Sequence, residues 1–201
     1  MSTLKYGIMG GTFNPIHYAH LFIAEEVLDN FKLDKILFMP TGTPPHKQNI
    51  NIDAFHRYTM TKLAVSNNPN FLVSDLEVLN SNVSYSVDTI RKLKLNHPDI
   101  EFYFITGTDA ILELPTWKEP RELLSLCKFV SVNRPNYVDE NLVNKINIIK
   151  NNLGGEIFLL NGHDINLSST QIRQRVREGK TVRYLLPDSV NDYILKNKLY
   201  V

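Results

Sequence analysis

Two histidines, His17 and His20, stand at the point where a short apolar segment gives way to a helical pattern. A glycine pair, Gly10-Gly11, precedes them, and glycines let a ligand approach the backbone because they have no Cβ atom. Residues three apart face the same side of a helical turn, and imidazole can hold phosphoryl oxygens as a cation or as a neutral N–H donor. The start of a helix adds unpaired N–H groups and a partial positive charge. Together these features predict a phosphate-binding site.

A second cluster that suits phosphate is Ser168-Ser169-Thr170, which is typical of an N-cap and predicts a helix over residues 168–178. The cluster supplies hydroxyls and free backbone N–H groups. Arg173 lies within about one turn of it, where a guanidinium can fork onto phosphate oxygens. The alternative is an ordinary N-cap followed by a solvated arginine, and this alternative fits Arg175 and Arg177 better.

Two further residues are candidates for recognising the rest of a nucleotide. Asp109 follows an expected strand, with Gly107 before it, and can accept hydrogen bonds from a ribose diol. Alternatively, it is a helix-start carboxylate that complements the helix dipole. Trp117, the only tryptophan, offers a flat face to a heteroaromatic ring, a contact worth roughly 1–3 kcal/mol by analogy with base stacking. Alternatively, it fills the core, as large aromatic side chains commonly do.

A polar segment over residues 41–52 has the composition of a loop and contains the sequence PPHK at 44–47. His46 and Lys47 offer two cationic or donor side chains on a stretch that the prolines stiffen. The alternative is a solvated surface loop without a ligand.

Strands and helices have to bring these separated residues together. Apolar segments predict strands at residues 4–9, 35–39, 71–78, 101–106, 128–132 and 156–160. Helical patterns alternate with them, which indicates an α/β fold with a Rossmann-like, doubly wound parallel sheet. We find no internal repeat and no change of composition, so we expect a single domain over residues 1–201. Ligands bind at the carboxyl ends of the strands in this architecture, which is where the candidate residues should converge.

The overall composition excludes several classes of protein. With 22 Lys and Arg against 21 Asp and Glu, the net charge is +1, which gives no electrostatic reason to expect nucleic-acid or membrane binding. Cys127 is the only cysteine, so an intramolecular disulfide and a Cys-based zinc cluster are excluded. The chain shows neither an apolar run of transmembrane length nor a signal-peptide pattern, and we therefore expect a soluble cytoplasmic protein.

The motifs, taken together and in order, resemble those of bacterial nicotinate-nucleotide adenylyltransferases. They are GGTFNPIH-x-x-H at 10–20, PPHK at 44–47, SYSVDT at 84–89, GTDAILELPTW at 107–117 and SSTQIRQRVREGK at 168–180. The first and last are shared by the wider nucleotidylyltransferase superfamily with its HxGH-type motif, and the others are specific to the family. The resemblance runs from about residue 5 to the C-terminus. The sequence departs from the family at Asn14, where Asp is frequent, at Ala19, where Gly is usual, and at Ser86, where Thr is usual.

The resemblance implies an enzyme of NAD biosynthesis that joins ATP and nicotinate mononucleotide to give deamido-NAD and pyrophosphate. By the family's pattern, His17, His20 and Arg173 are the catalytic residues. The residues implied to bind ATP are Gly10, Gly11, Thr12, Phe13, Gly107, Asp109, Ser168 and Ser169. Those implied to bind the mononucleotide are His46, Lys47, Ser86 and Trp117. Mg²⁺ would arrive with ATP, and we expect no protein ligands for a metal.

Other functions stay open on the sequence alone. The acceptor could be nicotinamide mononucleotide or phosphopantetheine, since one hydroxyl and a few N–H groups can decide between such acceptors. A protein of a different class, a nucleotide-binding regulator without catalysis, would also keep the phosphate site. The resemblance is compatible with a homo-oligomer, but no segment identifies an interface.

Overall fold

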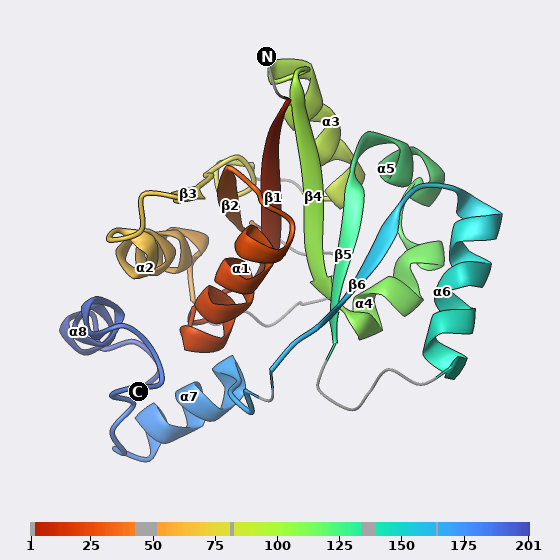
Figure 1. Cartoon of the computed structure of the whole chain (residues 1–201). Coiled ribbons are helices and arrows are strands. Elements are labelled where there is room, and N and C mark those ends of the chain that lie inside the picture. Colours follow the sequence, from red (N-terminus) through yellow and green to blue (C-terminus); the bar gives the residue numbers. More distant parts are fainter. Residues whose placement is uncertain (1–2, 43–51, 81–82, 134–139, 164) are drawn as a thin grey trace. The chain divides into compact units, whose positions relative to one another are not determined.

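The computed structural model describes residues 3–42, 52–80, 83–133, 140–163 and 165–201 (Figure 1). His46 and Lys47 lie outside these described residues. The strands are β1 (Leu4–Gly11), β2 (Lys35–Pro40), β3 (Phe71–Val73), β4 (Ile100–Gly107), β5 (Lys128–Asn133) and β6 (Ile157–Asn161). The helices are α1 (Tyr18–Asn30), α2 (Ala54–Val65), α3 (Ser86–Asn96), α4 (Thr108–Glu113), η1 (Leu114–Thr116), α5 (Pro120–Leu126), α6 (Glu140–Leu153), α7 (Ser169–Arg177) and α8 (Asp188–Lys196).

The strands form one sheet with the order β3-β2-β1-β4-β5-β6, which is the usual order of a Rossmann fold. Strands β1, β4, β5 and β6 are parallel neighbours in this sheet. The prediction of an α/β, Rossmann-like, doubly wound fold is therefore confirmed. Met9 on β1 is paired with Ile105 on β4, so Gly10 and Gly107 leave their strands at the same edge.

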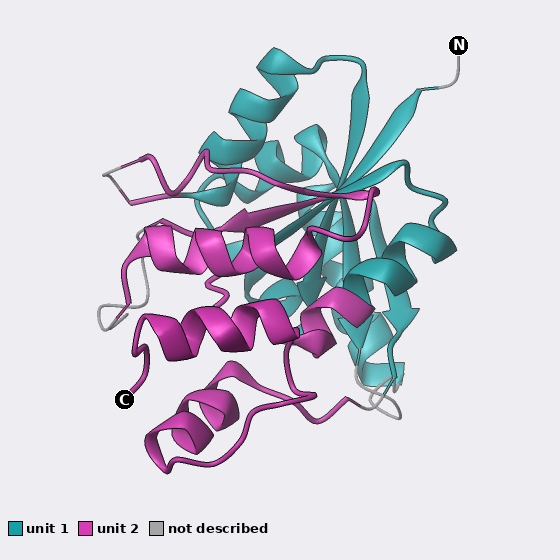
Figure 2. Cartoon of the chain, turned by 90° about the vertical axis from the view of Figure 1, so that its left-hand side faces the viewer, with its two compact units in different colours: residues 1–10, 23–36, 85–164 teal, residues 11–22, 37–84, 165–201 magenta. Residues whose placement is uncertain are grey.

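Contacts divide the chain into two compact units, each assembled from three separated segments (Figure 2). The first unit comprises residues 1–10, 23–36 and 85–164, and the second comprises residues 11–22, 37–84 and 165–201. The expectation of a single domain over residues 1–201 stays a prediction. In the first unit, Phe102, Ile105, Phe129 and Val130 are almost fully buried on β4 and β5. Such continuous apolar strands are typical of a parallel sheet that is covered on both faces.

Helices α2 and α8 pack against each other in the second unit. Ser189 on α8 donates a hydrogen bond to the carbonyl of Leu63 on α2 at 3.2 Å, and His56 Nδ1 lies 2.9 Å from the Tyr193 hydroxyl. Asp53 caps α2, because its carboxylate accepts the N–H of Phe55 at 2.6 Å. Asp is a favoured N-cap residue, because its carboxylate can accept such an N–H.

The third strand is shorter than predicted, since β3 ends at Val73 and the expected range of 71–78 is wrong. The Ser74 N–H still donates to the carbonyl of Phe38, but the Ser74 hydroxyl then accepts the N–H of Leu76 at 3.2 Å. Such local side-chain bonds to the backbone compete with a strand ladder. The apolar residues after Ser74 therefore belong to a turn.

Candidate functional site

The two histidines of the first motif stack on each other in the second unit. Their ring centroids are 3.8 Å apart and the rings are inclined by 23°. The backbone N–H of His17 donates to Nδ1 of His20 at 3.3 Å. A neutral His20 with an acceptor at Nδ1 carries its proton on Nε2, which makes that nitrogen a donor. The prediction that both rings face the same side is confirmed.

Burial keeps both histidines neutral at physiological pH. Desolvation lowers the pKa of His17 from 6.5 to about 4. Desolvation, and in second place the neighbouring charge of His17, lowers the pKa of His20 to about 3. In the part of the chain that the structure describes, Nδ1 of His17 is buried without a hydrogen-bond partner. The pair is therefore a set of neutral donors and acceptors in a poorly solvated setting, where an anion would interact strongly.

A loop with a fixed shape runs from Gly11, the last residue of β1, to residue 16, directly before His17; we call it the glycine loop. Phe13 is buried with a positive φ of 46°, a region that residues other than glycine seldom adopt, and its ring meets His20 edge-on at 5.1 Å. A Cβ at Gly11 would come within 2.9 Å of the Phe13 ring, so glycine is required there by packing alone. A Cβ at Gly10 would make an ordinary contact of 3.5 Å with Phe104. Packing within the protein therefore accounts for the glycine at position 11 but not for the glycine at position 10.

The second predicted cluster reaches the same loop. Ser168 caps α7 through a capping box with Gln171, as the sequence predicted for the N-cap. Ser169 donates its hydroxyl to the carbonyl of Pro15 at 2.9 Å. Arg173 donates to the carbonyl of Asn14 at 2.8 Å and to the Thr170 hydroxyl at 3.1 Å. The residues directly before His17 are therefore held by the start of α7.

Arg57 is a contact of this loop that the sequence analysis missed. Its guanidinium donates to the carbonyl of Thr12 at 2.8 Å and to that of Gly42 at 3.0 Å, and the residue is 1% exposed. A signal was present in the sequence, because Arg57 shares the buried face of α2 with Met60 and Ala64 at helical spacing. A charged residue in an apolar stripe is unusual and merits attention.

Tyr200 is the second missed contact. Its hydroxyl donates to the side-chain oxygen of Asn14 at 2.8 Å, across 186 positions of sequence. Burial raises the pKa of the Tyr200 phenol, so the group stays a protonated donor. No local pattern around Tyr200 points to this contact.

The first unit carries the residues predicted to meet the nucleoside and the acceptor. Asp109 is exposed in the first turn of α4. Beneath it, the buried Thr108 hydroxyl donates to the side-chain oxygen of Asn133, and the Ser131 hydroxyl lies 3.5 Å from that of Thr108. These polar residues at the ends of β4 and β5 fix the start of α4. The position of Gly107 is open, because a Cβ there would meet nothing within 4 Å among the described residues.

Trp117 and Ser86 belong to neighbouring parts of the first unit. Trp117 is half-buried, and its ring meets Phe104 edge-on at 6.1 Å and 78°. Its backbone N–H donates to the carbonyl of Leu114 at 3.1 Å. It therefore rests against the core without being enclosed by it, a position that fits both interpretations of this residue. Ser86 is half-buried at the first position of α3.

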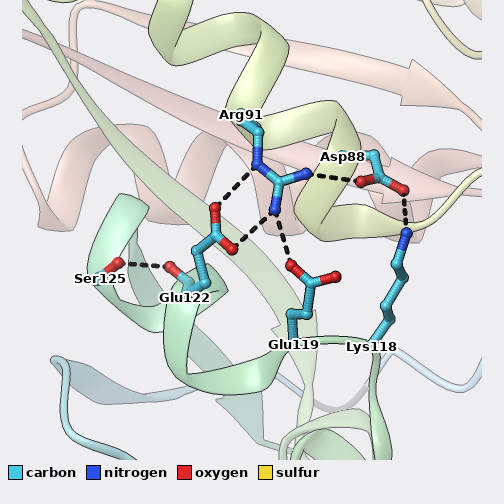
Figure 3. Close-up of polar contacts among 6 residues, drawn as sticks. All are labelled: Asp88, Arg91, Lys118, Glu119, Glu122 and Ser125. Carbon is cyan, nitrogen blue, oxygen red and sulfur yellow. Dashed lines mark hydrogen bonds and ion pairs between the residues drawn. The ribbon is translucent and has the colours of Figure 1, made fainter.

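A network of ion pairs joins α3 to the segment after Trp117 (Figure 3). Arg91 contacts both oxygens of Glu122 at 2.8 and 2.7 Å, Glu119 at 2.8 Å and Asp88 at 2.8 Å. Lys118 in turn contacts Asp88 at 2.9 Å. The hydrogen bond from Lys118, followed by the contacts with Arg91, lowers the pKa of Asp88. This network was not anticipated from the sequence.

The predicted site residues thus fall into two groups. His17, His20, Ser169 and Arg173 are gathered around one loop of the second unit, whereas Gly107, Asp109, Ser86 and Trp117 belong to the first. Within the described ranges, no group of three or more His, Cys, Asp or Glu could hold a metal ion. None of the helices described is long and apolar enough to cross a membrane.

Comparison with known proteins identifies the family of the chain. A family model described as cytidylyltransferase-like matches residues 8–175. The probable nicotinate-nucleotide adenylyltransferase of Thermoanaerobacter sp. (strain X514) is 46% identical over 98% of this chain and 94% of its own length. That of Geobacter sp. (strain M21) is 41% identical over 98% and 99%, respectively.

Solved structures show the same fold. The nicotinic acid mononucleotide adenylyltransferase of Plasmodium falciparum in complex with NaAD superposes with a TM-score of 0.78 at 24% identity, over 98% of this chain and 97% of that one. The same protein complexed with APC gives 0.75 at 22% identity over the same shares. At these identities the likeness supports the fold alone.

Proposed function

The chain belongs to the nicotinate-nucleotide adenylyltransferase family, and on this premise we propose that it joins nicotinate mononucleotide and ATP to give deamido-NAD and pyrophosphate. One observation of the structure supports the proposal most directly. The stacked His17 and His20 and the start of α7 converge on one glycine loop, and this is an arrangement of donors suited to a chain of phosphates.

The proposed reaction is a direct displacement at the α-phosphorus of ATP. An oxygen of the mononucleotide phosphate forms a new bond to this phosphorus, and the bond to the oxygen that bridges to the β-phosphorus breaks. Pyrophosphate leaves with that electron pair. The attacking phosphate is already an anion near neutral pH, so catalysis is positioning and charge stabilisation and requires no protein nucleophile.

The roles on the ATP side follow from the contacts of the second unit. His17 and His20 would donate to the phosphates as charge develops on the leaving group. A guanidinium carries five N–H donors, and Arg173 uses two of them on Asn14 and Thr170. Its remaining N–H donors would bind the β- and γ-phosphates, together with Ser168 and Ser169. The backbone of Gly10, Gly11, Thr12 and Phe13 would approach the nucleotide. Gly107 would also bind ATP, and Asp109 would contact its ribose.

On the acceptor side, the proposal assigns the pyridine ring to Trp117 and its carboxylate to Ser86. His46 and Lys47 would hold the mononucleotide phosphate. Mg²⁺ would accompany ATP, bound mainly by phosphate oxygens and water, and would neutralise part of the phosphate charge. The family resemblance also leads us to propose a cytoplasmic location and a homo-oligomer. Light scattering on the purified protein would test the oligomeric state.

The test is pyrophosphate release from Mg-ATP with nicotinate mononucleotide, run beside nicotinamide mononucleotide and phosphopantetheine. We expect strong turnover with the first acceptor. Turnover with another acceptor alone would keep adenylyl transfer and refute the acceptor-side assignments. If ATP bound but none of the three acceptors reacted, the protein would be a nucleotide-binding regulator.

A further inference from the structure

The loop before the histidines is held in large part through its backbone carbonyl groups. Four of its carbonyl oxygens, those of Gly11, Thr12, Asn14 and Pro15, accept hydrogen bonds from outside the loop. The donors are the Thr41 N–H, the Arg57 guanidinium, the Arg173 guanidinium and the Ser169 hydroxyl, at 2.8–2.9 Å. A carbonyl oxygen carries partial negative charge and repels phosphate when it points at the ligand. Here these oxygens are turned toward donors of the protein.

Arg57 stands out among these donors because of its burial. The residue is 1% exposed, and desolvation lowers its pKa, against which the charges of Tyr200 and Asp53 act only in second and third place. Its Nη atoms contact the Thr12 and Gly42 carbonyls, and no described residue accepts a hydrogen bond from its Nε. An arginine does not lose its proton in proteins, so a full positive charge is buried here at a considerable cost.

We propose that Arg57 is a positioning residue for the phosphates of ATP. Its guanidinium holds the Thr12 carbonyl oxygen toward itself, so that this oxygen does not point at the phosphates. Its buried charge adds a positive potential to the loop that leads to His17. This inference rests on the proposed function, because it takes the loop as the ATP-phosphate site. A purely structural role, in which Arg57 only ties the end of β1 to the end of β2, predicts a different outcome. ATP and the mononucleotide would then lose affinity to the same extent.

The test compares three substitutions that separate charge from hydrogen bonding. Arg57→Lys keeps the charge, Arg57→Gln keeps a donor without charge, and Arg57→Met removes both. We expect Arg57→Met to weaken the binding of Mg-ATP and of pyrophosphate about tenfold, since it removes both the positive charge near the loop and the donor that orients the Thr12 carbonyl. Arg57→Lys should recover part of this loss and Arg57→Gln less. The KM for the acceptor should change little in all three.

Arg175→Met is the matched control. Arg175 also donates to a backbone carbonyl of the second unit, that of Thr181 at 2.9 Å, but lies outside the loop. Affinity for Mg-ATP and pyrophosphate is measured by titration calorimetry, which needs no acceptor, and folding is checked by thermal unfolding.

The outcomes separate the two claims. If Arg57→Gln bound pyrophosphate with wild-type affinity, the proposed role of the charge would be wrong. It would also be wrong if Arg57→Lys lost affinity for ATP and for the acceptor to the same extent. Because Lys and Gln variants are compared, the inference stays testable if Arg57→Met fails to fold. A wild-type protein that binds ATP but uses another acceptor would refute the proposed function and leave the inference on Arg57 intact.

Discussion

Arg57 in the second unit and Arg91 in the first both hold separate parts of the chain together, but in opposite surroundings. Arg57 is 1% exposed and donates to backbone carbonyls, and its burial lowers its pKa. The Arg91 side chain is 37% exposed and faces three carboxylates. The hydrogen bonds with Glu122, and after them the one with Glu119, raise its pKa. The guanidinium of Arg57 is closed to water, whereas water and salt ions can reach that of Arg91. The Arg57 contacts of the loop should therefore be much less sensitive to salt than the ion pairs around Trp117.

The largest effect is expected at the histidines of the buried loop. His20→Ala should lower kcat by about 10²–10³-fold, the usual cost of losing one preorganised donor to developing charge. Pyrophosphate release measures this, with circular dichroism to confirm folding and the exposed His97→Ala as control. Unchanged turnover would mean that His20 does not contact the phosphates.

The acceptor side is probed by Trp117→Ala. If the indole stacks on the pyridine, its loss should raise the KM for nicotinate mononucleotide by about 5- to 150-fold, as for a stacking contact of about 1–3 kcal/mol. The KM for ATP should stay close to that of the wild type. Equal increases for both substrates, with a lower melting temperature, would instead assign Trp117 to the core.

Stability gives the most direct comparison of the two arginines. Arg57→Met should lower the free energy of unfolding by about 1–3 kcal/mol, because it leaves buried carbonyls without a donor. Arg91→Met should have a much smaller effect that disappears at high salt. Urea titrations at low and high NaCl measure both. If Arg91→Met lowered the free energy of unfolding more than Arg57→Met, the exposed arginine would contribute more to stability than the buried one.

The buried histidines also predict how stability depends on pH. Their pKa values are about 4 for His17 and about 3 for His20 in the folded protein, against 6.5 ordinarily. The unfolded chain therefore binds more protons below pH 6.5. The contribution of the neutral rings is complete above this pH and is lost as the pH falls toward about 4 and then 3. Urea unfolding across this range should show a flatter profile for His20→Gln than for the wild type. Parallel profiles would show that His20 is not the source.

The smallest effect is expected in the exposed network. Lys118→Met removes the contact with Asp88 next to Trp117 and should raise the KM for the mononucleotide slightly at low salt. Near 1 M NaCl, where the screening length is about 3 Å, wild type and variant should agree. The control is Lys128→Met, which removes a similar ion pair with Glu101 on the central strands. An effect that persists at high salt would show that the Lys118 contact is not mainly electrostatic.

Local patterns in the sequence predicted the fold class and some of the residues that lie around the loop, but not the hydrogen bonds that hold it. The alternation of strands and helices fixed the fold class, and the N-cap at Ser168 and the pairing of His17 with His20 follow from spacings of three or four residues. The end of β3 was mispredicted, because the hydroxyl of Ser74 bonds locally where apolar residues continue the pattern.

The contacts that sequence analysis missed join residues far apart in the chain. Tyr200 is 186 positions from Asn14, and Arg57 is 45 from Thr12, so neither pairing leaves a trace in local spacing. Burial of Arg57 was detectable in principle from its place on the apolar face of α2. The groups that Arg57 contacts there could not be predicted, because backbone carbonyls have no signature in the sequence.

The contacts of the loop also determine when it can form as the protein is made. Its clamps from Ser169, Arg173 and Tyr200 lie 154, 159 and 186 residues further along the chain. A ribosome that has just released residues 11–15 has therefore produced the loop long before the groups that hold it. Contacts of such long range form late, because closing a long chain segment costs entropy before any contact repays it. The loop is therefore synthesised long before the residues that hold it in its final shape.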